Sequence, residues 1–229
     1  MNFSGLEKLS LVDFDGVVSA TLFTAGCNFR CGFCHNSPLV LKENLPIILE
    51  EEVLAYLNKR AGIIEGVCIS GGEPTLEKGL LNFIEKLKKL NLKVKLDTNG
   101  TNPSVIKDLI ENALIDYVAM DIKSDKNTYS SVIGIKDYDT KNIEESVETL
   151  LSSKLDYEFR TTLIKEFHTE EVIKNISNWI KGAKKYALQK YVYRDTCLGN
   201  KLSLVEKEKA QEFKSILEKT INNVQLRGY

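Results

Sequence analysis

Three cysteines that lie close together in the sequence are the residues with the clearest chemistry. Cys27, Cys31 and Cys34 have the spacing Cys-x-x-x-Cys-x-x-Cys within a predicted loop, residues 26–36. Thiolates are soft ligands that favour iron–sulfur clusters or zinc over harder ions. A structural zinc site is closed by four protein donors, whereas a cubane iron–sulfur cluster held by three cysteines leaves one iron free to bind a reacting molecule. The spacing therefore predicts a metal centre with one open position.

A disulfide framework or a closed zinc site fits the cysteines less well. The chain has five cysteines, an odd number in 229 residues, which does not favour a disulfide-stabilised secreted domain. A zinc site could take His35 as its fourth donor, but His35 directly follows Cys34 and would have to bend back onto the same ion. Cys68 and Cys197 are isolated in the sequence, so we expect one cluster and no auxiliary one.

Glycine and polar residues follow several apolar segments further along the chain. A glycine pair lets backbone approach a ligand without side-chain obstruction. Asp121 and Lys123 lie on one side of an extended segment, because strand side chains alternate between faces. Taken alone, the glycine pair would mean only a turn, and Asp121 with Lys123 would more often be a surface ion pair. The candidates of this kind are Gly71, Gly72, Glu73, Asp97, Thr98, Asp121 and Lys123.

The cysteine loop and the glycine pair together resemble the radical S-adenosylmethionine (SAM) superfamily. In that family three cysteines bind a [4Fe-4S] cluster, and the fourth iron chelates the amino and carboxylate groups of SAM. The resemblance implies that Cys27, Cys31 and Cys34 are the cluster ligands and that Phe33 is the aromatic residue beside the cofactor. Residues 71–73 match the Gly-Gly-Glu segment that receives the amino group of SAM.

Two further segments resemble the branch of the superfamily that activates glycyl radical enzymes. The resemblance implies that Asp97, Thr98 and Asp121 help to hold a monovalent cation, Na⁺ or K⁺, beside the carboxylate of SAM. Asp97 would also belong to the cofactor site, and Lys123 would contact SAM directly. Arg160, in an Arg-Thr-Thr segment, matches an arginine that points towards the cofactor in that branch.

The resemblance extends from about residue 10 to residue 193 and is strongest to the anaerobic ribonucleoside-triphosphate reductase activating proteins. It implies that SAM is cleaved reductively to methionine and a 5′-deoxyadenosyl radical, which takes a hydrogen atom from a glycine of a partner enzyme. The electron would come from flavodoxin or ferredoxin. The alternatives are a pyruvate formate-lyase-type activating enzyme, a radical SAM enzyme acting on a small molecule or peptide, such as a deazapurine synthase, and a zinc-binding interaction module.

Composition narrows the possible partners and location. Thirty-one basic and thirty-two acidic residues give a formal net charge of −1, so the counterion release that drives general nucleic-acid binding has no obvious source. No apolar stretch approaches the ~20 residues needed to span a bilayer, and the first residues do not resemble a signal peptide. We expect a cytoplasmic protein that binds neither nucleic acid nor membrane, a location that also suits reduced thiols.

Apolar runs alternate with stretches of helical periodicity, which predicts a parallel sheet with right-handed crossovers. Six such units fall short of a closed eight-unit barrel, so we expect one domain, residues 1–229, with the (β/α)6 partial TIM barrel that radical SAM proteins have. The candidate residues fall at or near the carboxyl ends of strands, where such barrels place their chemistry. Strands are expected at 17–23, 66–70, 93–97, 117–121, 157–163 and 188–193, and helices at 50–59, 78–90, 103–112, 143–151, 170–181 and about 204–220.

Four residues with reactive or bulky side chains receive no role in this scheme. We expect His168 to be exposed, because its neighbours are polar. Trp179 occupies an apolar position of a helix and should join the core. Arg194 and Cys197 follow the last expected strand and either line the open side of the barrel or close a loop.

Overall fold

The computed structural model describes residues 1–199 and 202–229. Its centre is a curved eight-stranded sheet in the order β10-β9-β8-β7-β6-β5-β3-β2, in which neighbours are parallel except for the antiparallel pair β2 and β3. The strands are β2 (Gly5–Ser10), β3 (Ser19–Thr24), β5 (Gly66–Gly71), β6 (Lys93–Thr98), β7 (Tyr117–Asp121), β8 (Asp156–Leu163), β9 (Tyr186–Lys190) and β10 (Val224–Arg227). Two short strands, β1 (Asn2–Phe3) and β4 (Ile48–Leu49), form a separate antiparallel pair.

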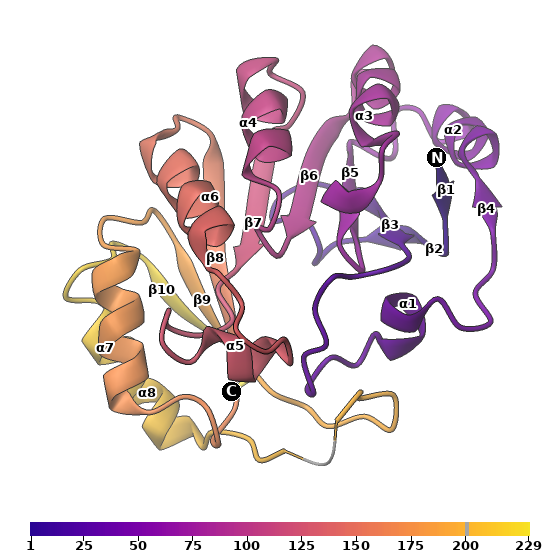
Figure 1. The fold of residues 1–229 in the computed structure, drawn as a ribbon. Helices are drawn as coiled ribbons and strands as arrows, with labels where there is room; N and C mark the ends of the chain where they lie inside the picture. Colours follow the sequence, from indigo (N-terminus) through magenta and orange to yellow (C-terminus); the bar gives the residue numbers. More distant parts are fainter. Residues whose placement is uncertain (200–201) are drawn as a thin grey trace.

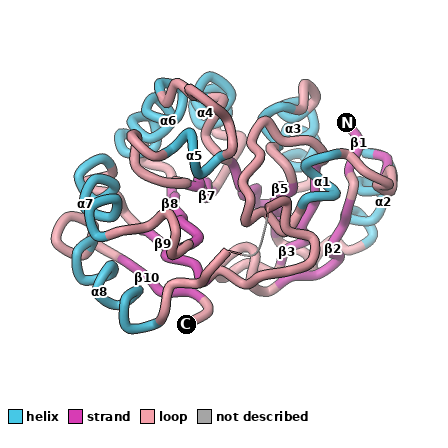
Figure 2. The backbone as a smooth tube through the Cα atoms, turned by 60° about the horizontal axis from the view of Figure 1, so that its bottom comes forward, coloured by secondary structure: helices cyan, strands magenta, loops and turns pink. Residues whose placement is uncertain are grey.

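The longer helices cover the outer face of this sheet, whereas the short helices α1 and α5 lie at the end where the loops that follow the strands gather (Figure 1, Figure 2). The helices are α1 (Ser37–Leu41), α2 (Glu50–Lys59), α3 (Leu80–Lys89), α4 (Pro103–Glu111), α5 (Tyr129–Ile133), α6 (Lys141–Ser152), α7 (Glu170–Trp179) and α8 (Lys207–Leu217), with a short 3-10 helix at Pro74–Leu76. The expected (β/α)6 partial barrel is confirmed: six parallel strands, β3 and β5 to β9, alternate with longer helices.

The six expected strands all form: the strand at 117–121 has the expected bounds, and the bounds of the others differ by one to three residues. The last of them begins earlier than expected, at Tyr186, and ends at Lys190. The C-terminal helix is shorter than expected, Lys207–Leu217, because Leu204 instead forms an isolated bridge to Ile164. The edge strands β2 and β10 were not expected, nor were the short elements β1, β4, α1 and α5.

The core lies between the outer face of the sheet and the helices. Helix α3 buries Leu80, Phe83, Ile84 and Leu87, which recur with the three-to-four-residue spacing of one helical face. Trp179 is half-buried and packs against this core at the end of α7. The wide apolar layer fixes the strands and therefore the positions of the residues at their ends.

The inner face of the sheet has a different composition. In β6, Val94 and Leu96 belong to the apolar core, whereas Lys95 and Asp97 pair with each other on the barrel side. Alternation along one strand therefore builds the core and a polar barrel interior at the same time. Among the described residues, no helix combines the length and the apolar character required to cross a bilayer.

Candidate functional site

A cavity of about 380 Å³ lies at the carboxyl ends of the parallel strands. It brings together residues from the cysteine loop and from β5, β6, β7 and β8, as expected for the functional end of a barrel. Of the residues predicted from the sequence, Glu73 alone does not line it. The predicted residues that do are Cys27, Cys31, Phe33, Cys34, Gly71, Gly72, Asp97, Thr98, Asp121, Lys123 and Arg160.

The three cysteines enter the cavity from the loop that follows β3. Cys31 is only 5% exposed, and burial raises the pKa of its thiol to about 12, although Lys123 acts in the opposite direction. Burial also raises the pKa of Cys27 and Cys34. These thiols need a bound cation of their own to become thiolates, and metal coordination supplies it. The donor set therefore fits a metal centre.

The arrangement of these donors bears on the kind of centre. In the described part of the chain, no three side chains of histidine, cysteine, aspartate or glutamate converge on one metal-ion position. A cubane does not require that they do, because each cysteine of a [4Fe-4S] site binds a different iron. Three cysteines spread around a cavity wall are thus compatible with a cluster.

The glycine pair is explained by close backbone packing. Gly71 has a φ of +114°, and a Cβ atom on Gly72 would lie 2.0 Å from the carbonyl oxygen of Gly26. Gly72 N–H donates to Thr24 O at 2.9 Å, and Glu73 N–H donates to Gly26 O at 2.8 Å. The end of β5 is therefore joined directly to the chain that enters the cysteine loop, and only glycine fits there.

Glu73 lies beneath the cavity and is 1% exposed. Its Oε1 accepts hydrogen bonds from Thr98 Oγ1 at 2.7 Å and Thr75 N at 3.0 Å, and its Oε2 accepts one from Asn99 N at 2.6 Å. Burial raises its pKa, while these hydrogen bonds act in the opposite direction. The carboxyl group thus connects the ends of β5 and β6.

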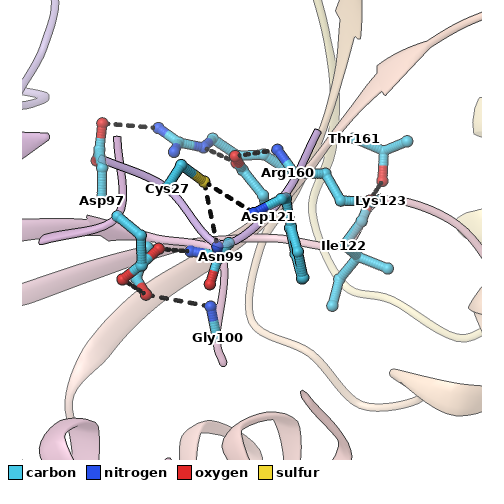
Figure 3. A network of polar contacts seen from close by, with 12 residues as sticks. Cys27, Asp97, Asn99, Gly100, Asp121, Ile122, Lys123, Arg160 and Thr161 are labelled. Carbon is cyan, nitrogen blue, oxygen red and sulfur yellow. Dashed lines mark hydrogen bonds and ion pairs between the residues drawn. The ribbon is translucent and has the colours of Figure 1, made fainter. Parts of the chain in front are cut away.

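A cluster of paired charges forms one side of the cavity (Figure 3). Arg160 bridges two carboxylates, with Nε 2.9 Å from Asp121 Oδ1 and Nη1 3.2 Å from Asp97 Oδ2. Lys123 Nζ lies 2.8 Å from Asp121 Oδ2, and Lys95 Nζ lies 3.1 Å from Asp97 Oδ1. Burial opposes ionisation of Asp121, but the charges of Arg160 and Lys123 outweigh it and lower its pKa to about 2. The Asp-x-Lys pair is therefore a partly buried ion pair at the site.

Lys95 was not among the residues predicted from the sequence. It lies two residues before Asp97, and side chains two apart in a strand share a face. The two-residue spacing of Lys95 and Asp97 was therefore the feature of the sequence that could have indicated Lys95. Its ammonium group also donates to the carbonyl oxygen of Asp13, so it connects β6 to the loop before β3.

His168 is buried, and the expectation that it is exposed was wrong. Its side chain is 3% exposed because the segment after β8 folds back against the barrel. Ile164 N–H donates to Nδ1 at 2.9 Å, so Nε2 carries the proton and donates to Lys123 O at 3.1 Å. Burial lowers its pKa, which keeps the ring neutral at pH 7. Polar neighbours in the sequence gave no sign of these backbone contacts.

Residues 196–199 cover the cysteine loop. Gly199 N–H donates to Gly32 O at 2.8 Å, and Leu198 N–H donates to Cys34 O at 3.3 Å. Cys197 contacts Phe33 O through its thiol at 3.8 Å, while Arg194 is exposed. This segment therefore closes a loop over the cysteines.

The cavity has further lining residues that sequence reasoning missed. Thr162 lies two residues after Arg160 on β8, and Gln189 lies beside it on β9. Strand alternation could have indicated Thr162. Asp13 reaches the cavity from the loop between β2 and β3, where its carboxylate accepts a hydrogen bond from Thr21 Oγ1 at 2.6 Å.

Sequence comparison provides independent information. The family model of the radical SAM superfamily matches residues 21–177. A Methanocaldococcus jannaschii protein, provisionally named a glycyl-radical enzyme activating enzyme, is 32% identical over an alignment of 233 positions, which covers 98% of this chain and 95% of the relative. A GTP 3′,8-cyclase of Helicobacter pylori is 35% identical over 156 residues, which cover 66% of this chain and 48% of the cyclase.

Solved structures share the fold at low sequence identity. A domain of pyruvate-formate lyase-activating enzyme from Bacteroides vulgatus has a TM-score of 0.57 at 18% identity, covering 71% of this chain and 99% of that domain. Streptococcus suis SuiB, bound to S-adenosylmethionine, has a TM-score of 0.68 at 16% identity, covering 90% of this chain and 49% of SuiB. At this identity the similarity concerns the fold alone.

Proposed function

Because this chain belongs to the radical SAM superfamily, we propose that it activates a glycyl radical enzyme, and specifically an anaerobic ribonucleoside-triphosphate reductase. Members of the superfamily use a [4Fe-4S] cluster and SAM. The observation that carries the proposal is the single cavity that joins three cysteines to the Asp97–Arg160–Asp121–Lys123 ion pairs.

When bound, a reduced [4Fe-4S] cluster would supply one electron to SAM, giving methionine and a 5′-deoxyadenosyl radical. That radical would take a hydrogen atom from glycine, leaving 5′-deoxyadenosine and a glycyl radical. We assign Cys27, Cys31 and Cys34 to the cluster. No side chain has to act as a general acid or base in this reaction. The protein instead binds and orients the cofactors and the substrate and excludes side reactions.

The chain's own residues suit the binding of a zwitterion such as the methionine part of SAM. Lys123 presents an ammonium group for a carboxylate, held in place by Asp121 at 2.8 Å. Asp97, Thr98 and Asp121 offer oxygen donors of the kind that hold Na⁺ or K⁺. Phe33 is buried beside Lys123, whose Nζ lies 5.9 Å from the centre of its ring.

The similarity to the M. jannaschii protein supports a protein substrate, because it spans nearly the whole of both chains.

The electron that reduces the cluster is assigned to an external donor, flavodoxin or ferredoxin. The five cysteines, three of them in the cavity, leave too few thiols for a second cluster.

A direct experiment uses the anaerobically reconstituted protein, reduced with flavodoxin or dithionite, together with SAM and anaerobic ribonucleoside-triphosphate reductase. A glycine-centred doublet in the electron paramagnetic resonance spectrum is expected. The matched control is the reductase with alanine in place of the radical glycine, which should give no doublet. Failure to form the doublet, with intact cluster absorbance, rejects the reductase as partner. A doublet on pyruvate formate-lyase instead would reassign the partner within the same reaction.

A second candidate is a small-molecule radical SAM enzyme, which the identity to the GTP 3′,8-cyclase favours. That relative is about twice as long as the matched segment, since the chain covers 48% of it. Incubation with GTP or with a deazapurine precursor separates the two functions, because only the second candidate consumes a heterocycle without a protein partner. Metal analysis tests the zinc module at the same time: one zinc and no acid-labile sulfide would support it.

A further inference from the structure

We propose that Thr162 and Gln189 form the part of the cavity wall that binds the peptide backbone beside the substrate glycine. This inference rests on the proposed glycyl radical function and names the groups that would recognise its substrate. Both residues line the cavity. They are direct neighbours across the parallel strands β8 and β9, where Thr162 pairs with Gln189 in register.

The two side chains share a face with the ion-pair cluster. Thr162 lies two residues after Arg160 in β8, so both point to the inner side of the sheet. The intervening residue, Thr161, belongs to the other side, where its hydroxyl contacts Ile122 O and Tyr186 Oη at 2.5 Å each. Thr162 and Gln189 thus extend the polar wall from Arg160 towards the β10 edge of the sheet.

Their hydrogen-bonding capacity is unused within the chain. Across the described residues, 1–199 and 202–229, neither the Thr162 hydroxyl nor the Gln189 carboxamide has a hydrogen-bond partner. The other polar side chains on this wall contrast with them, since Asp97, Asp121, Lys123 and Arg160 are all engaged in ion pairs. A polar wall with unused donors and acceptors is suited to a ligand that can form hydrogen bonds. Covering such polar groups without giving them a partner costs free energy.

The chemistry of the pair matches a peptide group. A carboxamide and a hydroxyl each donate and accept hydrogen bonds and carry no charge. An extended chain that passes a glycine presents N–H and C=O groups of the same kind, without a side chain to keep the wall at a distance.

The charge of the cavity disfavours the alternative substrate class. Among the described residues that line it, apart from the cysteines and a neutral His35, three carboxylates stand against two cations. Both cations, Lys123 and Arg160, are already paired with Asp97 or Asp121. A triphosphate would therefore meet a wall that is acidic overall, whereas an uncharged backbone would not be repelled.

The test measures activation as a function of partner concentration. The variants are Gln189→Leu, Thr162→Val and the double variant, and the matched control is Gln211→Leu on the exposed face of α8. Glycyl radical yield is followed by electron paramagnetic resonance with the anaerobic reductase. A nine-residue peptide centred on the radical glycine serves as a binding probe, and its alanine version as the probe control. Melting temperatures verify folding.

The double variant is expected to raise the KM for the reductase and the Kd for the peptide roughly tenfold, the loss expected for one to two hydrogen bonds. The rate at saturating reductase should fall much less than kcat/KM, a split that a general structural defect would not give. Gln211→Leu should keep the wild-type KM. Equal KM values for the double variant and Gln211→Leu overturn the inference.

Three further outcomes have a defined meaning, and the last two separate the inference from the proposed function. If Gln189→Leu does not fold, the nearly isosteric Thr162→Val alone tests the inference. An unchanged KM for the reductase in this variant then contradicts a role of Thr162 in binding the peptide backbone. A wild-type protein that forms no glycyl radical rejects the proposed function. A wild type that forms the radical, with variants of unchanged KM, rejects this inference only.

Discussion

The Nε2 atom of His168 lies 3.1 Å from the carbonyl oxygen of Lys123, so a buried histidine holds the backbone of a residue that lines the cavity. The side chain of Lys123 is held separately by Asp121. Backbone and ammonium group are therefore fixed from opposite ends, and the position of the charge depends on a histidine that does not itself line the cavity.

This contact predicts an acid-sensitive contribution to stability. Burial lowers the pKa of His168, so at mildly acidic pH the unfolded chain binds a proton that the folded chain does not. Unfolding should become easier as the pH falls from 7 to 5, through the value near 6.5 of an unfolded histidine. In His168→Gln this loss should be smaller, at a cost of about 1 kcal/mol at pH 7, because a carboxamide differs in shape from the ring and keeps only one of the two contacts, to Ile164 N–H or to Lys123 O. Urea unfolding at both pH values measures it, and identical pH dependence in the two proteins would refute it.

The assignment of the cluster ligands predicts that cysteine variants differ sharply in iron content after reconstitution. Cys31→Ala should lose most of its iron and acid-labile sulfide after reconstitution, together with the visible absorbance of the cluster. Cys68→Ala is the matched control, because Cys68 is equally buried but does not line the cavity. Iron analysis of the two proteins decides the matter; equal iron contents would argue against the proposed ligands.

The backbone contact of Gly72 predicts that even a methyl group is harmful there. In Gly72→Ala the new Cβ would lie 2.0 Å from Gly26 O, and backbone has to move. We expect a loss of about 2 kcal/mol, or roughly 4 to 8 °C in Tm, and weaker SAM binding by calorimetry. In Gly79→Ala the nearest atom is Met1 Cβ at 3.3 Å, a contact that a shift of a few tenths of an ångström relieves, so the loss should be smaller. A similar Tm loss in both variants would contradict the close packing.

The paired charges predict that partly buried and exposed ion pairs contribute very differently to the free energy of unfolding. Arg160→Gln leaves the partly buried Asp97 and Asp121 close together without their shared counter-charge and should destabilise the protein by about 3 kcal/mol. Lys107→Gln removes a pair with Glu111 whose side chains are 59% and 61% exposed, and should cost less than about 0.5 kcal/mol. Chemical denaturation followed by circular dichroism compares them, and comparable losses would show that the cluster is not effectively buried.

Much of the fold could be predicted because parallel strands covered by helices are apolar runs. The strand at 117–121 and the helix at 50–59 form with the expected bounds. Strand β2 could not be recognised, since Glu7 and Lys8 are exposed at the edge of the sheet and interrupt the pattern. Strand β10 has four residues and depends on its pairing with β9, which no local pattern reveals.

The candidate site was predictable where its residues follow one another along a strand. Asp121 and Lys123 share a face through simple alternation, and the structure joins them in an ion pair. Gln189 and His168 depend on which strands and loops become neighbours once the sheet curves. Their positions follow from tertiary structure, so the local sequence carries little sign of them.

The cover formed by residues 196–199 has a consequence for biogenesis. The carbonyl groups of Gly32 and Cys34 receive their hydrogen bonds from backbone that is translated more than 160 residues later. A nascent chain that has just left the ribosome with its cysteines thus lacks the segment that shelters them. Iron–sulfur delivery to this protein should accordingly follow the synthesis of residues 196–199, and scaffold proteins would meet a barrel whose strands β3 to β9 have already been made.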